Sequence, residues 1–222
     1  MNKLLLATLA LSLTACNDDE TPTAPSADVE LKSIISQKSL TGNPAADRLI
    51  PSINTEISQL GKELFFSKSL GGDRDSACVT CHHPTLGGGD NLSLPIGTEA
   101  DNPDLLGVGR SNDLAENNPE GGPPVPRNAP TTFNTALWDQ VLFHDGRVEA
   151  LDKTENSNGA NGTSGGIRTP DSDFGTADPL AGQNLVQAQA RFPITSREEM
   201  KGFNHNNNYD SNQAIRNQGK RI

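Results

Sequence analysis

A mainly α-helical domain with long glycine- and asparagine-rich loops is the fold class that the sequence predicts, on three observations. Two stretches carry apolar residues at three- and four-residue steps, the spacing of one helix face. The 222-residue chain has 21 Gly and 15 Pro and is only 33% hydrophobic, a thin core for its length. The run Cys78-Val79-Thr80-Cys81-His82 lies between the two stretches. A large cofactor bound there would help so loop-rich a chain to stay compact.

The first helical stretch covers residues 54–66, and the second covers residues 131–153. The apolar residues of the first are Ile57, Leu60, Leu64 and Phe65. The second is interrupted at Asp145-Gly146, so we expect two short helices around a turn there. A third, weaker stretch begins near Ala181 and ends before Pro193. Long loops rich in Gly and Asn lie between these stretches, at residues 87–89, 117–126 and 156–166.

The N-terminus has the pattern of an export signal. Residues 1–3 are Met-Asn-Lys, an apolar run follows over residues 4–13, and Thr14-Ala15-Cys16 places small residues before a cleavage point. The run is too short to span a membrane. It resembles the lipobox of bacterial lipoproteins, in which acyl chains on the cysteine contribute roughly 0.8 kcal/mol per buried methylene. We expect residues 1–15 to be removed and Cys16 to anchor the protein at a membrane surface facing the periplasm, with a plain signal peptide as the alternative.

The composition narrows the class of partner. The formal net charge is −10, which argues against nucleic acid and suits docking to a basic electron carrier. A solvated acidic face is the commoner explanation of such a charge. Residues 16–58 are polar and contain several prolines, so we expect a flexible, lipid-anchored linker there.

With Cys16 lipidated, the chain keeps two cysteines that are separated by two residues, and three kinds of site have that spacing. A zinc site needs two further Cys or His residues, but His83, His144 and His205 have no paired arrangement. A thioredoxin-like redox pair opens a helix after a strand, and no strand is predicted before Ser76. The third kind is covalent haem attachment, in which Cys78 and Cys81 reach the two porphyrin vinyl groups. We therefore predict one haem c, with His82 as the proximal iron ligand.

Three motifs surround this site in order: residues 60–66 (LGKELFF), residues 127–131 (RNAPT) and residues 143–147 (FHDGR). Together they resemble the N-terminal haem domain of bacterial di-haem cytochrome c peroxidases and of their relatives that mature methylamine dehydrogenase. The match spans about residues 57–153, and residues 192–200 echo it more faintly. The resemblance implies a cytochrome c-like haem domain over residues 59–203 that reduces hydrogen peroxide. Its electrons would come from a small cytochrome or cupredoxin.

The chain departs from the family in two places. Members of the family carry a second Cys-x-x-Cys-His motif, which this sequence lacks, so we expect residues 204–222 to begin a C-terminal region that is missing here. Many members also carry a histidine that caps the resting haem, in a Ser-Ile-Gly-His context. The matching run here is Pro95-Ile96-Gly97-Thr98. The resemblance therefore implies an open or water-filled sixth iron position, unless His144 or His205 fills it.

Peroxide cleavage needs a base that takes a proton from one oxygen and returns it to the other. Relatives place a glutamate five residues after the arginine of the Asp-Gly-Arg motif, which corresponds to Asp152 here. Asp152 is thus the predicted acid/base residue, and a solvated helix residue is its alternative. The family glutamine before the Phe of this motif is replaced by Leu142.

Arginines are the candidates for contacts to haem propionates, because a guanidinium group matches a carboxylate. Arg147 has this role or forms a salt bridge to Asp145. Arg127 and Asn128 fit the same role or fix a loop. Trp138 either packs in the core, which we favour, or relays electrons.

The loop over residues 156–179 is either a flexible insertion or a calcium site. Its acidic residues Asp171, Asp173 and Asp178 are not at EF-hand spacing, which favours the insertion. Two hypotheses compete with the peroxidase function: a non-enzymatic mono-haem electron carrier, and an inactive fragment. A second axial ligand on the iron would favour the carrier, whereas an open iron beside a carboxylate would favour the enzyme.

Overall fold

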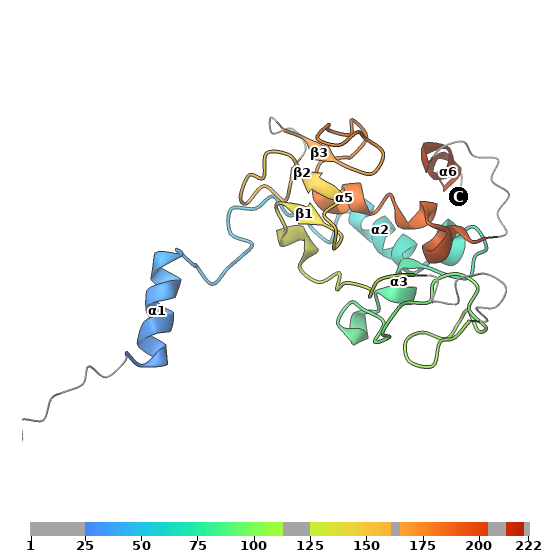
Figure 1. Cartoon of the computed structure of the whole chain (residues 1–222), viewed down its shortest axis with the longest axis horizontal. Coiled ribbons are helices and arrows are strands. Elements are labelled where there is room, and N and C mark those ends of the chain that lie inside the picture. The colour runs from blue at the N-terminus through green and yellow to red at the C-terminus, as the bar shows by residue number, and fades with distance from the viewer. Residues whose placement is uncertain (1–24, 113–124, 161–164, 204–211, 220–222) are drawn as a thin grey trace, which may run out of the picture. The chain divides into compact units, whose positions relative to one another are not determined.

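The computed structural model describes residues 25–112, 125–160, 165–203 and 212–219 (Figure 1). The chain forms two compact units, Met1–Pro44 and Ala45–Ile222. The first contains helix α1 (Ala27–Gln37), in which no residue is buried. This helix lies inside the stretch for which the sequence predicts a flexible linker, and Cys16 lies outside the described residues. Within the described ranges, no helix is long and apolar enough to cross a membrane.

Helix α2 (Glu56–Phe66) confirms the helix that the apolar spacing predicts over residues 54–66. It begins at Thr55, whose side chain accepts a hydrogen bond from the Ser58 N–H and so satisfies a free donor of the first turn. None of its residues is buried, and Ile57 and Leu60 are 76% and 58% exposed. Part of the apolar helix face is therefore left uncovered by the described residues.

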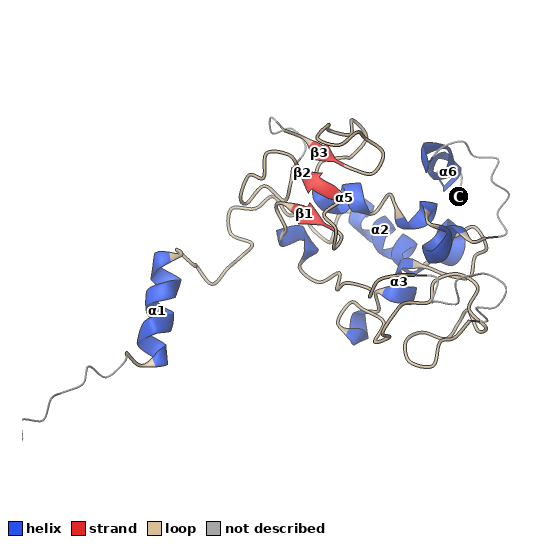
Figure 2. Cartoon of the chain, in the orientation of Figure 1, coloured by secondary structure: helices blue, strands red, loops and turns tan. Residues whose placement is uncertain are grey.

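The prediction of two short helices over residues 131–153 was wrong. Only a 3₁₀ turn, η3 (Thr135–Leu137), forms in the first half of this stretch, and a hairpin of β1 (Val141–Leu142) and β2 (Val148–Ala150) follows (Figure 2). The turn was placed correctly, because Gly146 has a φ of +67°. Burial alternates along β2, with Val148 and Ala150 buried and Glu149 partly exposed, as expected for a strand. A period of two and a helical period are hard to tell apart over so few residues.

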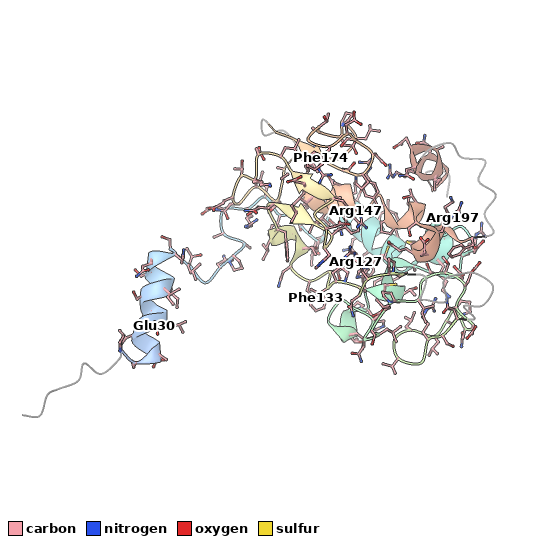
Figure 3. The ribbon with its side chains drawn as sticks, viewed as in Figure 1. Glu30, Arg127, Phe133, Arg147, Phe174 and Arg197 are labelled. Carbon is pink, nitrogen blue, oxygen red and sulfur yellow. The ribbon has the colours of Figure 1, made fainter. Side chains whose placement is uncertain are left out.

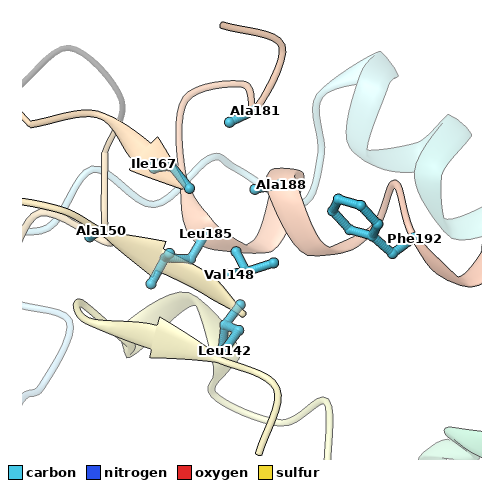
Figure 4. Packing of buried hydrophobic residues seen from close by; sticks show 8 residues of the cluster. All are labelled: Leu142, Val148, Ala150, Ile167, Ala181, Leu185, Ala188 and Phe192. Carbon is cyan, nitrogen blue, oxygen red and sulfur yellow. The ribbon is translucent and has the colours of Figure 1, made fainter. Parts of the chain in front are cut away.

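The described sheet has three antiparallel strands in the order β1-β2-β3, and β3 is Ile167–Arg168. Val141 pairs with Glu149, and Ala150 pairs with Ile167. Helix α5 (Leu185–Gln189) packs on this sheet and forms the core with it (Figure 4). The core residues are Leu142, Val148, Ala150, Ile167, Ala181, Leu185, Ala188 and Phe192. Leu142 therefore packs in the core.

Helix α5 lies within the third predicted stretch but is shorter than that stretch. It starts at Asn184, whose side chain accepts from the Gln187 N–H. A 3₁₀ turn, η4 (Pro193–Thr195), and a π-helix, η5 (Arg197–Lys201), come next. The short helix α3 (Cys78–Cys81) carries the cysteine motif, and the 3₁₀ turns η1 (Lys68–Leu70) and η2 (Pro84–Leu86) precede and follow it.

Ion pairs connect the loop after β3 to helix α6 (Asn212–Gly219). Arg191 binds Asp178 at 2.7 Å and Asp171 at 3.3 Å. Arg216, which is 7% exposed, also pairs with Asp171 and donates to the Arg191 carbonyl oxygen at 2.9 Å. Because arginines neutralise both carboxylates, the structure gives no support to a calcium site on this loop.

We predict that Asp178→Asn lowers the free energy of unfolding at pH 7 by about 1.5–3 kcal/mol, the range for hydrogen bonds to a charged group. Burial alone would raise the pKa of Asp178, but hydrogen bonds from Thr169 and Arg191 hold it below its usual range. The stabilisation is therefore present at neutral pH and is lost as the pH falls below about 4. Urea unfolding at several pH values measures it. Exposed Asp173→Asn is the control, and equal losses in both variants would contradict the assignment.

Candidate functional site

The cysteine motif occupies a single helical turn. Cys78 and Cys81 begin and end α3, so the three-residue spacing places both thiols on the same side of the helix. The buried Thr80 hydroxyl accepts a hydrogen bond from the Ala77 N–H at 3.0 Å, which fixes the start of the turn. The His82 N–H donates to the Cys78 carbonyl oxygen at 3.0 Å and closes it. The backbone thus holds two thiols and one imidazole together.

Two carbonyl groups fix the orientation of the His82 ring. Its Nδ1 lies 3.0 Å from the Pro130 oxygen and 3.2 Å from the Gly88 oxygen. Carbonyl oxygens only accept, so Nδ1 carries the proton and the lone pair remains on Nε2. A histidine held in this way is oriented as a metal ligand. Pro130 belongs to the second sequence motif, so the fold brings the first two parts of the predicted site together.

The two thiols do not form an activated redox pair. Burial raises the pKa of Cys78. Burial, with the charges of Asp90 and Glu199, raises the pKa of Cys81 to about 12. Both thiols are therefore protonated at neutral pH, whereas a thioredoxin-like pair needs a thiolate. Among the described residues, no group of three or more His, Cys, Asp or Glu side chains could hold a metal ion, so a zinc site lacks ligands.

These residues fit a haem. Two thiols on one turn and an imidazole with a free Nε2 are the donor set that covalent haem attachment uses. Helix α2 contacts α3, and its exposed apolar side chains offer a surface for a large apolar ring. Phe66 of this helix is 50% exposed and packs edge-on against Phe65, with ring centroids 5.4 Å apart. Nothing in the donor set or in this wall conflicts with haem.

The third motif forms a charged cluster at the hairpin turn. Arg147 pairs with Asp145 at 2.9 Å and lies over the Phe143 ring, 3.5 Å from its centroid. The charge of Arg127 also acts on the Asp145 carboxyl and helps to lower its pKa, against the effect of burial. Figure 3 shows Arg127 and Arg147 near one another. The structure therefore shows the salt bridge that was one of the two predictions for Arg147, and a propionate contact stays a prediction for both arginines.

A carboxyl group that the sequence analysis did not single out lies beside the cysteine motif. Burial raises the pKa of Glu199, and the positive charge of Arg147 opposes this effect. The charge of Glu199 acts in turn on the thiols of both Cys78 and Cys81. Glu199 is therefore electrostatically coupled both to the haem motif and to Arg147. Its only sequence signal is its place in the faint family echo over residues 192–200.

The segment that lacks a capping histidine holds Glu199 in place. Thr98 has no exposed surface, and its hydroxyl donates to the Arg197 carbonyl oxygen at 2.8 Å while its N–H donates to the Glu198 oxygen at 3.1 Å. A Cβ atom on Gly97 would overlap the Glu198 carbonyl oxygen. Thr98, which stands where many family members carry a capping histidine, thus supports the π-helix η5.

Other predicted residues lie in different surroundings. Arg147 comes directly before β2, whereas Asp152 comes two residues after the other end of this strand. The backbone of Asp152 packs against Gly165. The Asn128 amide donates to the Leu92 and Ser93 carbonyl oxygens, so it fixes a loop. Trp138 is 55% exposed, and the preferred core-packing role was therefore wrong. His144 is exposed, and His205 lies outside the described residues.

A Cys-x-x-Cys-His turn with an oriented histidine, an exposed apolar wall and a nearby half-buried carboxyl defines a c-type haem protein. The family model of the di-haem cytochrome c peroxidases matches residues 55–219. The chain belongs to this family, whose membership implies haem c as its cofactor.

Relatives agree with this assignment. The methylamine utilization protein MauG of Methylorubrum extorquens is 29% identical over 194 residues, which are 86% of this chain and 37% of that protein. The cytochrome c551 peroxidase of Pseudomonas aeruginosa is 31% identical over 99 residues, which are 45% of this chain and 22% of that protein. The chain thus spans well under half of the length of these relatives. A comparison with solved structures found no match.

We predict that Gly97→Ala destabilises the protein by about 1–3 kcal/mol, the usual cost of overpacking, because the new methyl group displaces η5 and with it Glu199. Thermal unfolding measures the change. Gly61→Ala is the matched control, since no atom lies within 4 Å of its Cβ position on α2. A helical Gly-to-Ala change there should stabilise by roughly 0.5–1 kcal/mol. Equal effects of the two substitutions would refute the close contact.

Proposed function

We propose that this chain is the peroxidatic haem domain of a di-haem peroxidase-like enzyme. It reduces hydrogen peroxide with electrons from a small cytochrome or cupredoxin. The observation that supports catalysis over simple electron carriage is the half-buried Glu199 carboxyl, whose charge acts on the Cys78 thiol and which the charge of Arg147 influences in turn. A pure electron carrier needs no such group, whereas peroxide cleavage needs a proton acceptor.

The chain's residues divide the work. Cys78 and Cys81 would form the thioether bonds, and Nε2 of His82 would bind the iron. A haem held by these residues would supply the redox chemistry that carries electrons from the donor to peroxide. The Glu199 carboxylate takes a proton from the near oxygen of peroxide and returns it to the far oxygen, which leaves as water. Two electrons and two further protons complete the conversion of peroxide to two water molecules.

The raised pKa of Glu199 suits this role. A carboxyl that titrates closer to neutral pH exchanges its proton more readily than an ordinary glutamate, which titrates near pH 4.3. The charge of Arg147 favours the ionised form that accepts the proton, and burial favours the protonated form that returns it. Asp152 stays the second candidate for the acid/base group.

We also propose that the haem-bearing domain is cytochrome c-like. The contact between α2 and α3 supports it, since a helix beside the attachment turn gives one wall of a haem pocket. Export to the periplasm and a lipid anchor at Cys16 are proposed from the lipobox-like run at residues 13–16.

We predict that Glu199→Gln reduces peroxide consumption by the haem-loaded protein by about 10²- to 10⁴-fold, the range for loss of a general acid/base group. Asp152→Asn is the comparison variant for the second candidate, and it should keep near-normal activity if Glu199 is the acid/base group. Stopped-flow reaction with excess peroxide measures both rates.

The pH profile separates a proton-transfer role from a structural one. In the unaltered protein the rate should fall on acidification, with a midpoint above about pH 4.3, because protonated Glu199 cannot accept a proton. Glu199→Gln should remove this acidic limb. Full activity in Glu199→Gln together with its loss in Asp152→Asn would assign the role to Asp152. Full activity in both variants would favour the electron carrier.

A further inference from the structure

Two buried charges of opposite sign act on the Cys81 position. Asp90 is 2% exposed and Arg110 is 4% exposed, and neither was singled out from the sequence. The Gly88 carbonyl oxygen, two residues before Asp90, lies 3.2 Å from Nδ1 of His82, and Arg110 donates to the oxygen of Gly97, which packs against the Glu199 backbone. In agreement with this placement, the carboxylate of Asp90 adds to the effect of burial in raising the pKa of the Cys81 thiol, and the guanidinium of Arg110 lowers it. The two side chains therefore impose opposing electric potentials at the sulfur through which a haem would be attached.

The fold holds Arg110 without a direct counter-ion. Its Nε donates to the Ile96 oxygen at 2.7 Å, and its Nη2 donates to the Gly97 oxygen at 2.6 Å. Its Nη1 donates to the Leu105 oxygen at 2.8 Å and to the Pro103 oxygen at 3.2 Å. Within the described ranges, no carboxylate lies at ion-pairing distance from it. Carbonyl dipoles thus hold a full positive charge in a buried position.

Asp90 is fixed to the backbone next to the haem motif. It follows Gly89, whose carbonyl oxygen accepts from the His83 N–H at 2.8 Å. One carboxylate oxygen accepts from the Leu92 N–H at 3.0 Å, and the other is buried with no hydrogen-bond partner among the described residues. The negative charge of Asp90 is therefore only partly compensated, and water does not screen it.

Oxidised haem carries one more positive charge than reduced haem. A buried anion close to it stabilises the oxidised form and lowers the reduction potential, and a buried cation does the opposite. We propose that Asp90 and Arg110 tune the reduction potential of the haem attached at Cys81. Asp90 lowers this potential and Arg110 raises it. This inference rests on the proposed haem attachment, and goes beyond it by naming the groups that tune the attached haem.

The test is a spectroelectrochemical titration of the haem-loaded chain and its variants. Asp90→Asn keeps the shape of the side chain and removes its charge, so the midpoint potential should rise. Asp104→Asn is the control. Asp104 lies between Asp90 and Arg110 in the sequence, but its side chain is 90% exposed, so water screens its charge. Its midpoint potential should equal that of the unaltered protein.

Loss of packing alone would not give this result. Water that enters a loosened site screens buried charges and favours the more charged, oxidised haem, so it lowers the potential. The rise in reduction potential expected for Asp90→Asn is opposite to the fall that water entry would cause. Arg110→Gln should lower the potential, whereas Arg110→Lys should keep it near the original value although hydrogen bonds are lost.

An unchanged or lower potential in Asp90→Asn would overturn the inference. So would equal shifts in Arg110→Gln and Arg110→Lys, because charge would then not be the cause. Haem staining of the denatured protein is measured separately. If the unaltered chain carries no covalent haem, the proposed function fails and this inference fails with it. If haem is attached but the potential does not follow the charges, only the inference fails.

Discussion

The hydrogen bond between the His82 ring and the Pro130 carbonyl oxygen joins the haem motif to a segment 48 residues later in the chain. Iron binding by the motif depends on it, because it fixes the tautomer of the ring and leaves Nε2 free for iron. The Gly88 carbonyl supports the same nitrogen from the loop that follows the motif. A four-residue helix alone could not orient the imidazole in this way.

A second constraint is the close packing of residues 97–98 against η5. A threonine stands where many relatives were expected to carry a capping histidine, and here it holds the π-helix whose Glu199 faces the motif. The same segment supplies the carbonyl oxygens that bind Arg110. Glu199 and Arg110 thus depend on one stretch of backbone, so the proposed proton acceptor and a proposed tuning charge are positioned together.

The sequence predicts the haem ligands and α2, because Cys78, Cys81 and His82 and the apolar spacing of one helix are local signals. It does not predict the hairpin at β1 and β2, since these strands are too short to show their period. Glu199 was missed because a π-helix has no sequence pattern and its burial arises from contacts far along the chain. Buried Asp90 and Arg110 were missed for the same reason. Asp152 was predicted from the family resemblance, and the propionate contacts of Arg127 and Arg147 from the match of a guanidinium group to a carboxylate; both stay predictions.

The proposed site holds a covalent haem through Cys78 and Cys81, with His82 on an iron that peroxide can reach. The most direct test is the electron paramagnetic resonance spectrum of the oxidised, haem-loaded protein before and after one equivalent of hydrogen peroxide. We expect a high-spin ferric signal that peroxide abolishes, since no histidine occupies position 98. A low-spin signal that does not respond to peroxide would show a capped iron and would contradict the account.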